Sequence, residues 1–126
     1  MASSTSDEMQ TVVLDTNALL MPFEIGINLD LEVLNLLGEV RFVVPGPLVG
    51  ELKHLENKHA KAALAIARKR EIVPSEEHGD NAVLEVAQRE NGYILTNDKE
   101  LRRRARKLGI PLIYLRSGTH LIVEYA

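Results

Sequence analysis

The amino-acid sequence predicts an α/β fold, a three-layer α/β/α sandwich with a central parallel sheet. Two patterns predict it: short apolar runs alternate with helical patterns along the chain, and these runs are apolar on both faces. Strands of that kind belong to parallel sheets that helices cover on both sides. A length of 126 residues, 45% of them hydrophobic, suits one domain with a sizeable core.

The first elements are expected close to the N-terminus. Residues 1–10 are polar and predict a flexible tail, so the domain itself is expected to span residues 11–126. The apolar run 11–14 predicts the first strand, and apolar residues spaced by three and four predict a helix over 27–37. The run 40–44 predicts the second strand, which a Pro-Gly-Pro sequence ends.

The middle of the chain is expected to be mostly helical. Leucines spaced by three and four open a helix at Leu48, and an Ala-rich segment predicts another over 58–70. Residues 72–73 predict a short strand, and residues 75–79 a loop.

The last third repeats the alternation of helix and strand. Helices are expected over 80–91 and 98–108, because a glycine follows each of these periodic segments and ends it. Strands are expected over 93–96 and 110–115, where the residues are mostly apolar.

Composition excludes several classes of function. The chain has no cysteine, so disulfides, cysteine-ligated metals and cysteine nucleophiles are ruled out. No apolar run approaches the ~20 residues that a membrane span needs, and the N-terminus does not resemble a signal peptide, so a cytoplasmic protein is expected. The net charge is −3, yet residues 96–116 carry seven bases against two acids, which favours a polyanionic partner.

Four carboxylates are placed where chemistry is expected. Asp15 and Asp98 come just after predicted strands, and ligands of open parallel sheets bind at that edge. Glu51 and Asp80 share the apolar stripe of their predicted helices, as Asp98 does in its own, and an inward-facing carboxylate is costly unless it is paired or binds a metal. Singly, each acid could instead serve as a helix cap, a turn residue or a solvated side chain.

Taken together, the four acids favour a metal site. The topology of a parallel sheet brings strand ends and the following helix starts to one edge, so the four side chains can converge there. Ligands that are all oxygen point to Mg²⁺ or Mn²⁺, ions suited to phosphate chemistry. The basic side chains that could grip an RNA backbone are Lys53, Lys99, Arg102, Arg103 and Arg106. For about half of such residues the alternative is a solvated helix face.

The blocks around the four acids resemble those of PIN domain nucleases. They are Val13-Leu14-Asp15-Thr16-Asn17, Val49-Gly50-Glu51-Leu52, Gly79-Asp80-Asn81 and Ile94-Leu95-Thr96-Asn97-Asp98. The resemblance implies a nuclease that cuts RNA with Mg²⁺ or Mn²⁺, with Asp15, Glu51, Asp80 and Asp98 as the catalytic and metal-holding acids. It also implies that Asn17 and Thr96 are supporting polar residues. Some members carry a further Asp where this chain has Glu100, which leaves the number of metal ions open.

The segment from Asp98 to Arg116 sharpens the expected function. It is similar to compact archaeal PIN proteins that resemble endonucleases of small-subunit ribosomal RNA processing. We therefore expect a ribosomal RNA processing endonuclease, with ribosome-assembly factors as candidate partners and a homodimer as a candidate assembly. The alternatives are a toxin-type PIN ribonuclease with an antitoxin partner, and a non-catalytic RNA-binding scaffold. The presence of all four acids argues against the scaffold.

Overall fold

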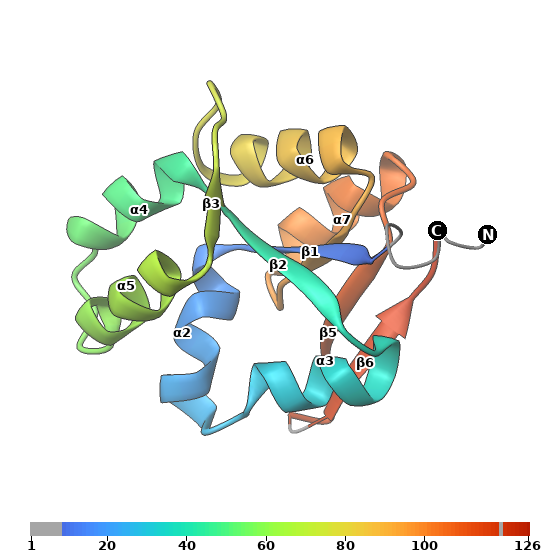
Figure 1. The fold of residues 1–126 in the computed structure, drawn as a ribbon, viewed down its shortest axis with the longest axis horizontal. Helices are drawn as coiled ribbons and strands as arrows, with labels where there is room; N and C mark the ends of the chain where they lie inside the picture. Colours follow the sequence, from blue (N-terminus) through green and yellow to red (C-terminus); the bar gives the residue numbers. More distant parts are fainter. Residues whose placement is uncertain (1–8, 119) are drawn as a thin grey trace.

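A computed structural model describes residues 9–118 and 120–126 of the chain, which form one mixed sheet between two layers of helices (Figure 1). The strand order is β3-β2-β1-β4-β5-β6. The strands are β1 (Gln10–Leu14), β2 (Val40–Pro45), β3 (Glu71–Val73), β4 (Tyr93–Leu95), β5 (Leu112–Arg116) and β6 (His120–Glu124). The helices are α2 (Thr16–Ile25), α3 (Leu29–Leu37), α4 (Gly46–Lys53), α5 (Ala60–Lys69), α6 (Gly79–Glu90) and α7 (Lys99–Lys107).

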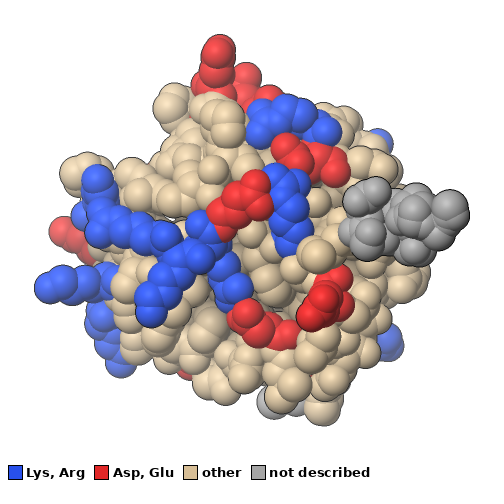
Figure 2. Space-filling view, in the orientation of Figure 1, with Lys and Arg blue, Asp and Glu red and all other residues tan. Residues whose placement is uncertain are grey.

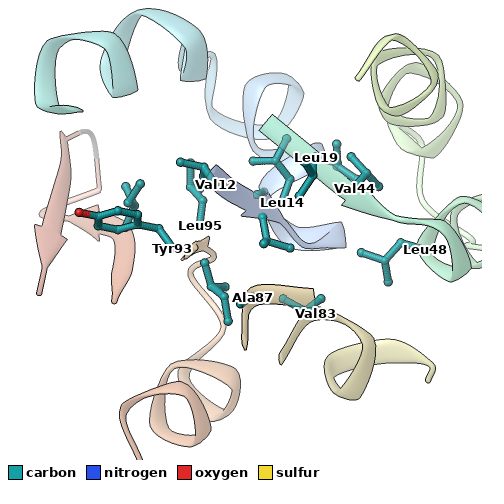
Figure 3. Packing of buried hydrophobic residues seen from close by; sticks show 14 of the residues in the cluster. Val12, Leu14, Leu19, Val44, Leu48, Val83, Ala87, Tyr93 and Leu95 are labelled. Carbon is teal, nitrogen blue, oxygen red and sulfur yellow. The ribbon is translucent and has the colours of Figure 1, made fainter. Parts of the chain in front are cut away.

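The helices cover both faces of the sheet. Helices α2, α3 and α5 lie on one face, and α6 and α7 lie on the other (Figures 1 and 3). Helix α4 continues directly from β2 and packs against α5 and α6. The predicted three-layer α/β/α architecture is thus confirmed. Among the described residues, no helix has the length and apolar character that crossing a membrane requires.

The structure adds two elements that the sequence patterns did not predict. Helix α2 was not predicted, because it lacks the amphipathic period that marks a surface helix. Residues Ala18 to Met21 are four consecutive buried residues, and Pro22 lies inside the helix. Strand β6 pairs antiparallel with β5 after a turn that includes Ser117 and Gly118, both with positive φ. An antiparallel edge strand on an otherwise parallel sheet is a common arrangement.

The N-terminal boundary lies close to the predicted one. Strand β1 begins at Gln10, one residue before the expected start of the domain. The predicted tail falls mainly on residues 1–8, which lie outside the described residues.

The core is centred on the two middle strands (Figure 3). The residues from Val12 to Leu14 and from Ile94 to Leu95 are fully buried, and helices pack on both sides of them. Each buried Leu or Ile side chain of this kind contributes about 1.5–3 kcal/mol to the free energy of folding. The carboxyl ends of β1 and β4 are therefore held firmly, and the candidate site lies directly beyond them.

We expect a Gly92→Ala substitution to destabilise the protein by about 1–3 kcal/mol, because the core would have to shift to accept it. A Cβ atom at Gly92 would lie 2.7 Å from the backbone oxygen of Thr11 in β1. Gly50→Ala is the matched control, since a Cβ there meets nothing within 4 Å and alanine favours the helix by up to about 1 kcal/mol. Urea unfolding of both variants measures the difference, and equal midpoints for wild type and Gly92→Ala would contradict the close contact.

Candidate active site

Asp15 and Thr96 join the carboxyl ends of the two central strands. Leu14 and Leu95 are partners in the β1–β4 register, so the residues that follow them lie side by side. The Thr96 hydroxyl donates to Asp15 Oδ2 at 2.5 Å, and the backbone N–H of Ala18 donates to Asp15 Oδ1 at 2.7 Å. Asp15 is 5% exposed and Thr96 is fully buried, so this pair is a fixed part of the core edge.

Asp98 is tied to this pair through the backbone. Its N–H donates to Thr96 Oγ1 at 3.0 Å, and its own Oδ1 accepts from Leu101 N at 2.8 Å, which caps α7. Asn17 and Asn97 hold the same loop, since Asn97 N donates to Asn17 Oδ1 at 2.8 Å. The predicted supporting residues Asn17 and Thr96 therefore both contact the segment that carries Asp98.

Glu51 and Asp80 approach from α4 and α6. The backbone N–H of Gly79 donates to Glu51 Oε2 at 2.8 Å, so a side chain of α4 caps the start of α6. Asp80 lies in the first turn of α6, next to Gly79. Both acids are half-buried. The contact between Glu51 and Gly79 sets the position of α4 relative to the start of α6.

All four predicted acids line one cleft of about 240 Å³ at the carboxyl edge of the sheet. Its walls are Asp15, Thr16, Asn17, Leu48, Glu51, Leu55, Gly79, Asp80, Val83 and Asp98. The elements that supply the acids follow β1, β2, β3 and β4, so the parallel topology brings all four acids to one edge of the sheet. A larger hollow of about 550 Å³ lies against α3 and β2, but its acids and bases are intermixed there, and the Arg70 guanidinium is bonded to Asp30. The smaller cleft, with its four acids, is therefore the candidate active site.

Burial and the charges of neighbouring acids raise the pKa values of two acids in the cleft, Asp15 and Asp80. Burial is the largest cause of the rise in the pKa of Asp15 to about 7, and the charges of Asp80 and Asp98 add to it, while the hydrogen bonds from Thr96 and Ala18 oppose it. The pKa of Asp80 is also raised, by burial and then by Asp98, and Arg104 opposes that rise. These two carboxyl groups therefore keep their protons to higher pH than an exposed aspartate does, and a bound cation would favour their release.

The donor set of the cleft suits a hard divalent cation. No ion pair in the described part of the chain involves Asp15, Glu51, Asp80 or Asp98. The predicted convergence of the acids is only partial, since within residues 9–118 and 120–126 no three acidic or imidazole side chains lie close enough together to hold a metal ion. Oxygen ligands with several water molecules are the coordination that Mg²⁺ prefers, so a cation could bind here without all four acids converging.

One sequence interpretation is corrected by the structure. The helical phase of Asp98 predicted an inward-facing acid, but its residue is exposed and its side chain caps α7. The cap or first-turn role that was weighed for Asp80 and Asp98 is present in both, since Asp98 caps α7 and Asp80 lies in the first turn of α6. Asp15, which was weighed as a turn residue, also caps a helix, because it accepts from the N–H of Ala18 at the start of α2. Capping uses one carboxylate oxygen and leaves lone pairs free, so it does not exclude a bound cation.

None of the five predicted RNA-binding residues is among the residues that line the cleft. Arg103 is paired with Glu100 in the same helix, and Arg106 is paired with Glu124 of β6. Arg102 lies 4.4 Å over the ring of Tyr114. Lys53 and Lys99 are exposed at the end of α4 and the start of α7. Their contact with RNA stays a prediction.

Charge on the face shown in Figure 2 falls into two zones. Lys and Arg side chains gather over the region of α5, whereas acids and bases alternate where β2 and β3 cross the front of the molecule. In the second zone Arg41 bridges Glu71 and Glu90. On α5, Lys61, Arg68 and Lys69 are exposed, and none of them forms an ion pair with a described residue.

The sequence interpretation counted Arg104 in the basic cluster 102–107 that could grip a phosphate backbone, but it did not single this residue out. Arg104 Nη2 donates to Asn81 Oδ1 at 2.5 Å, which links α7 to the first turn of α6 next to Asp80. Arg104 lies among four other bases within six residues, and nothing in that run marks it apart. Only the packing of α6 against α7 distinguishes it.

Comparison with known proteins places the chain in a family. The sequence profile described as PIN like domain matches residues 12–118. Ribonuclease VapC9 of Archaeoglobus fulgidus is 30% identical over 132 residues, covering 94% of this chain and 93% of that protein. Ribonuclease VapC4 of Methanocaldococcus jannaschii is 31% identical over 120 residues, covering 86% and 92%. The solved PIN domain endonuclease Utp24 shares the fold, with a TM-score of 0.76 at 23% identity over 92% of this chain and 95% of that one. The chain therefore belongs to the PIN-like domain family, as its four acidic blocks predicted.

Proposed function

We propose that this protein is a Mg²⁺- or Mn²⁺-dependent endoribonuclease that hydrolyses phosphodiester bonds of RNA. The observation that carries the proposal is one cleft lined by Asp15, Glu51, Asp80 and Asp98 without an ion-pair partner for any of them among the described residues. Two relatives that align over most of this chain are named ribonucleases, which supports RNA as the substrate class.

We assign different roles in catalysis to the four acids. Asp15, Asp80 and Asp98 would hold the cation, and Glu51 would hold it or orient the attacking water. A bound Mg²⁺ or Mn²⁺ supplies a nucleophile at neutral pH and neutralises charge on the phosphate. Thr96 fixes Asp15 by hydrogen bonding and receives the Asp98 N–H, so it keeps two of the acids at a set separation. Asn17 restrains the same loop through Asn97.

Metal removal tests the activity directly. Purified protein is expected to cut single-stranded or looped RNA with Mn²⁺ or Mg²⁺, leaving a 5′-phosphate and a 3′-hydroxyl, and to stop when EDTA is added. Restoring Mn²⁺ in excess of the EDTA should restore cleavage. Gel analysis of a 5′-labelled RNA measures this, and cleavage that continues in EDTA would contradict the proposed mechanism.

The RNA target forms the finer part of the proposal. We propose a precursor of small-subunit ribosomal RNA, on the resemblance of residues 98–116 to processing endonucleases. A toxin-type ribonuclease remains the alternative, and it would copurify with a small antitoxin. Crosslinking of the protein to RNA in cells separates the two: enrichment of precursor ribosomal RNA supports processing, whereas copurification with a small inhibitory protein supports the toxin.

A further inference from the structure

Three arginines of α7 form ion pairs or an aromatic contact with residues that do not line the cleft. Arg103 and Arg106 pair with Glu100 and Glu124, and Arg102 lies over the ring of Tyr114. Each ion pair cancels the charge of one of these guanidinium groups. An RNA phosphate would have to displace an acid to bind Arg103 or Arg106, and exposed ion pairs are worth up to about 1 kcal/mol.

Arg104 has a different kind of partner. Its Nη2 donates to the neutral amide oxygen of Asn81 at 2.5 Å, and it forms no ion pair with a described residue. Its positive charge is therefore not cancelled by a paired acid. Arg104 is half-buried, so its position is more restrained than that of an exposed side chain.

The place of Arg104 is set by two helices that border the cleft. Asn81 follows Asp80 in the first turn of α6, and Asp80 lines the cleft. Helix α7 begins directly after Asp98, another acid of the cleft. The hydrogen bond to Asn81 thus holds the positive charge of Arg104 next to the helix turn that carries Asp80.

We propose that Arg104 binds a non-bridging phosphate oxygen of the RNA strand at the rim of the cleft between α6 and α7. The inference rests on the proposed function, since it assigns a contact for that substrate. A polyanion that enters a cleft lined by four acids is repelled, and a fixed cation at the rim offsets part of that repulsion. The guanidinium fork has five N–H donors and matches phosphate geometry, and Asn81 engages only one of its nitrogens. Asn81 therefore orients the fork and leaves donors for the phosphate.

The test compares variants in the cleavage-deficient Asp98→Asn background. Arg104→Ala, Arg104→Lys and Arg68→Ala are measured for binding to a labelled single-stranded RNA, in Mn²⁺ and over a series of salt concentrations. Arg68→Ala removes the same charge from an exposed arginine of α5 that has no ion pair in the described part of the chain. Thermal melts confirm that each variant is folded.

We expect Arg104→Ala to raise the Kd about tenfold and to reduce the salt slope by about 0.7, the value of one phosphate contact on a single strand. Arg104→Lys should keep the slope, because the charge remains, and lose part of the affinity, because the fork is gone. Arg68→Ala should change the Kd by less than about twofold. A Kd for Arg104→Ala equal to that of Arg68→Ala would overturn the inference.

A second measurement separates binding from an indirect effect on Asp80. If Arg104 acted only through Asp80, Arg104→Ala would alter the Mn²⁺-induced shift in melting temperature and leave the RNA Kd unchanged, which also overturns the inference. The proposed function fails separately: in that case the wild-type protein itself neither binds nor cuts RNA. Wild-type cleavage together with normal RNA binding by Arg104→Ala would remove this inference alone.

Discussion

Asp98→Asn is expected to abolish RNA cleavage while leaving the fold and RNA binding in place. Removing even a supporting group of a metal site costs roughly 10–100-fold in activity, and loss of a cation-holding carboxylate should cost more. Asparagine caps a helix about as well as aspartate, so the hydrogen bond from Leu101 N at the start of α7 can be kept. Single-turnover cleavage of a labelled RNA in Mn²⁺ gives the loss, and binding of the same RNA gives the affinity.

The control for Asp98→Asn is Asp30→Asn, which removes the same charge from the first turn of α3, on a side chain 60% exposed. Asp30→Asn should cleave within a few-fold of the wild type. If Asp98→Asn retains more than about a tenth of wild-type cleavage, Asp98 is not a cation ligand, and the site would have to be assigned to the three remaining acids.

The stability of the metal-free protein is expected to fall as the pH rises from about 4 to 8, and Asp15 is the main reason. The pKa of Asp15 is about 7 in the folded protein against an ordinary 3.8. Below about pH 4 the Asp15 carboxyl is protonated in both the folded and the unfolded state, so its full contribution to the free energy of unfolding is present. Above that, the unfolded chain releases the proton while the folded chain keeps it, so the free energy of unfolding decreases until the pH passes 7. At about 1.4 kcal/mol per pKa unit, the change is on the order of 4 kcal/mol.

Asp15→Asn should flatten this dependence, since asparagine does not titrate. Urea unfolding in EDTA between pH 4 and 8 measures the slope for both proteins. Slopes, not absolute stabilities, are compared because the Asp15→Asn substitution also changes the hydrogen bond with Thr96. Asp30→Asn again serves as the control. The hydrogen bond from Arg70 lowers the pKa of Asp30, so Asp30 contributes to stability above its unfolded pKa and loses this contribution toward acid pH. The decrease in the free energy of unfolding between pH 4 and 8 should therefore be the same in Asp30→Asn as in the wild type. A wild-type stability that is flat over this range would contradict an uncompensated acidic cleft.

The sequence predicted the acids of the site better than it predicted their surroundings. Asp15 could be assigned because it directly follows a strand that is buried on both faces, and the edge of a parallel sheet gathers such residues. Helix α2 could not be found, since a helix buried on most sides has no polar face to mark its period. The role of Thr96 came from the family resemblance, and its hydrogen bond to Asp15 depends on the register of β1 and β4, which no local pattern encodes.

The arginines of α7 are a second case in which the sequence did not reveal the partners of a residue. From the sequence, the arginines of residues 102–106 are equivalent cations on one helix. In the fold, Arg106 donates a hydrogen bond to Glu124 of β6, and Arg104 donates one to Asn81 of α6. Because β6 was not predicted, the acid that neutralises Arg106 could not be placed either. Local periodicity predicts which face a residue occupies, and tertiary contacts decide which charges remain available.

The strand order has a consequence for when the site comes into existence during synthesis of the chain. Strand β1 is made first but lies between β2 and β4, and the hydrogen bond between Asp15 and Thr96 spans 81 residues of sequence. At roughly 5–20 residues per second, a ribosome needs several seconds to make that interval. During this time the growing chain gains Glu51 and then Asp80, but it still lacks Thr96 and Asp98. The complete acidic cleft can therefore form only after Asp98 has been made, and the translation machinery is not exposed to an assembled cleft before then.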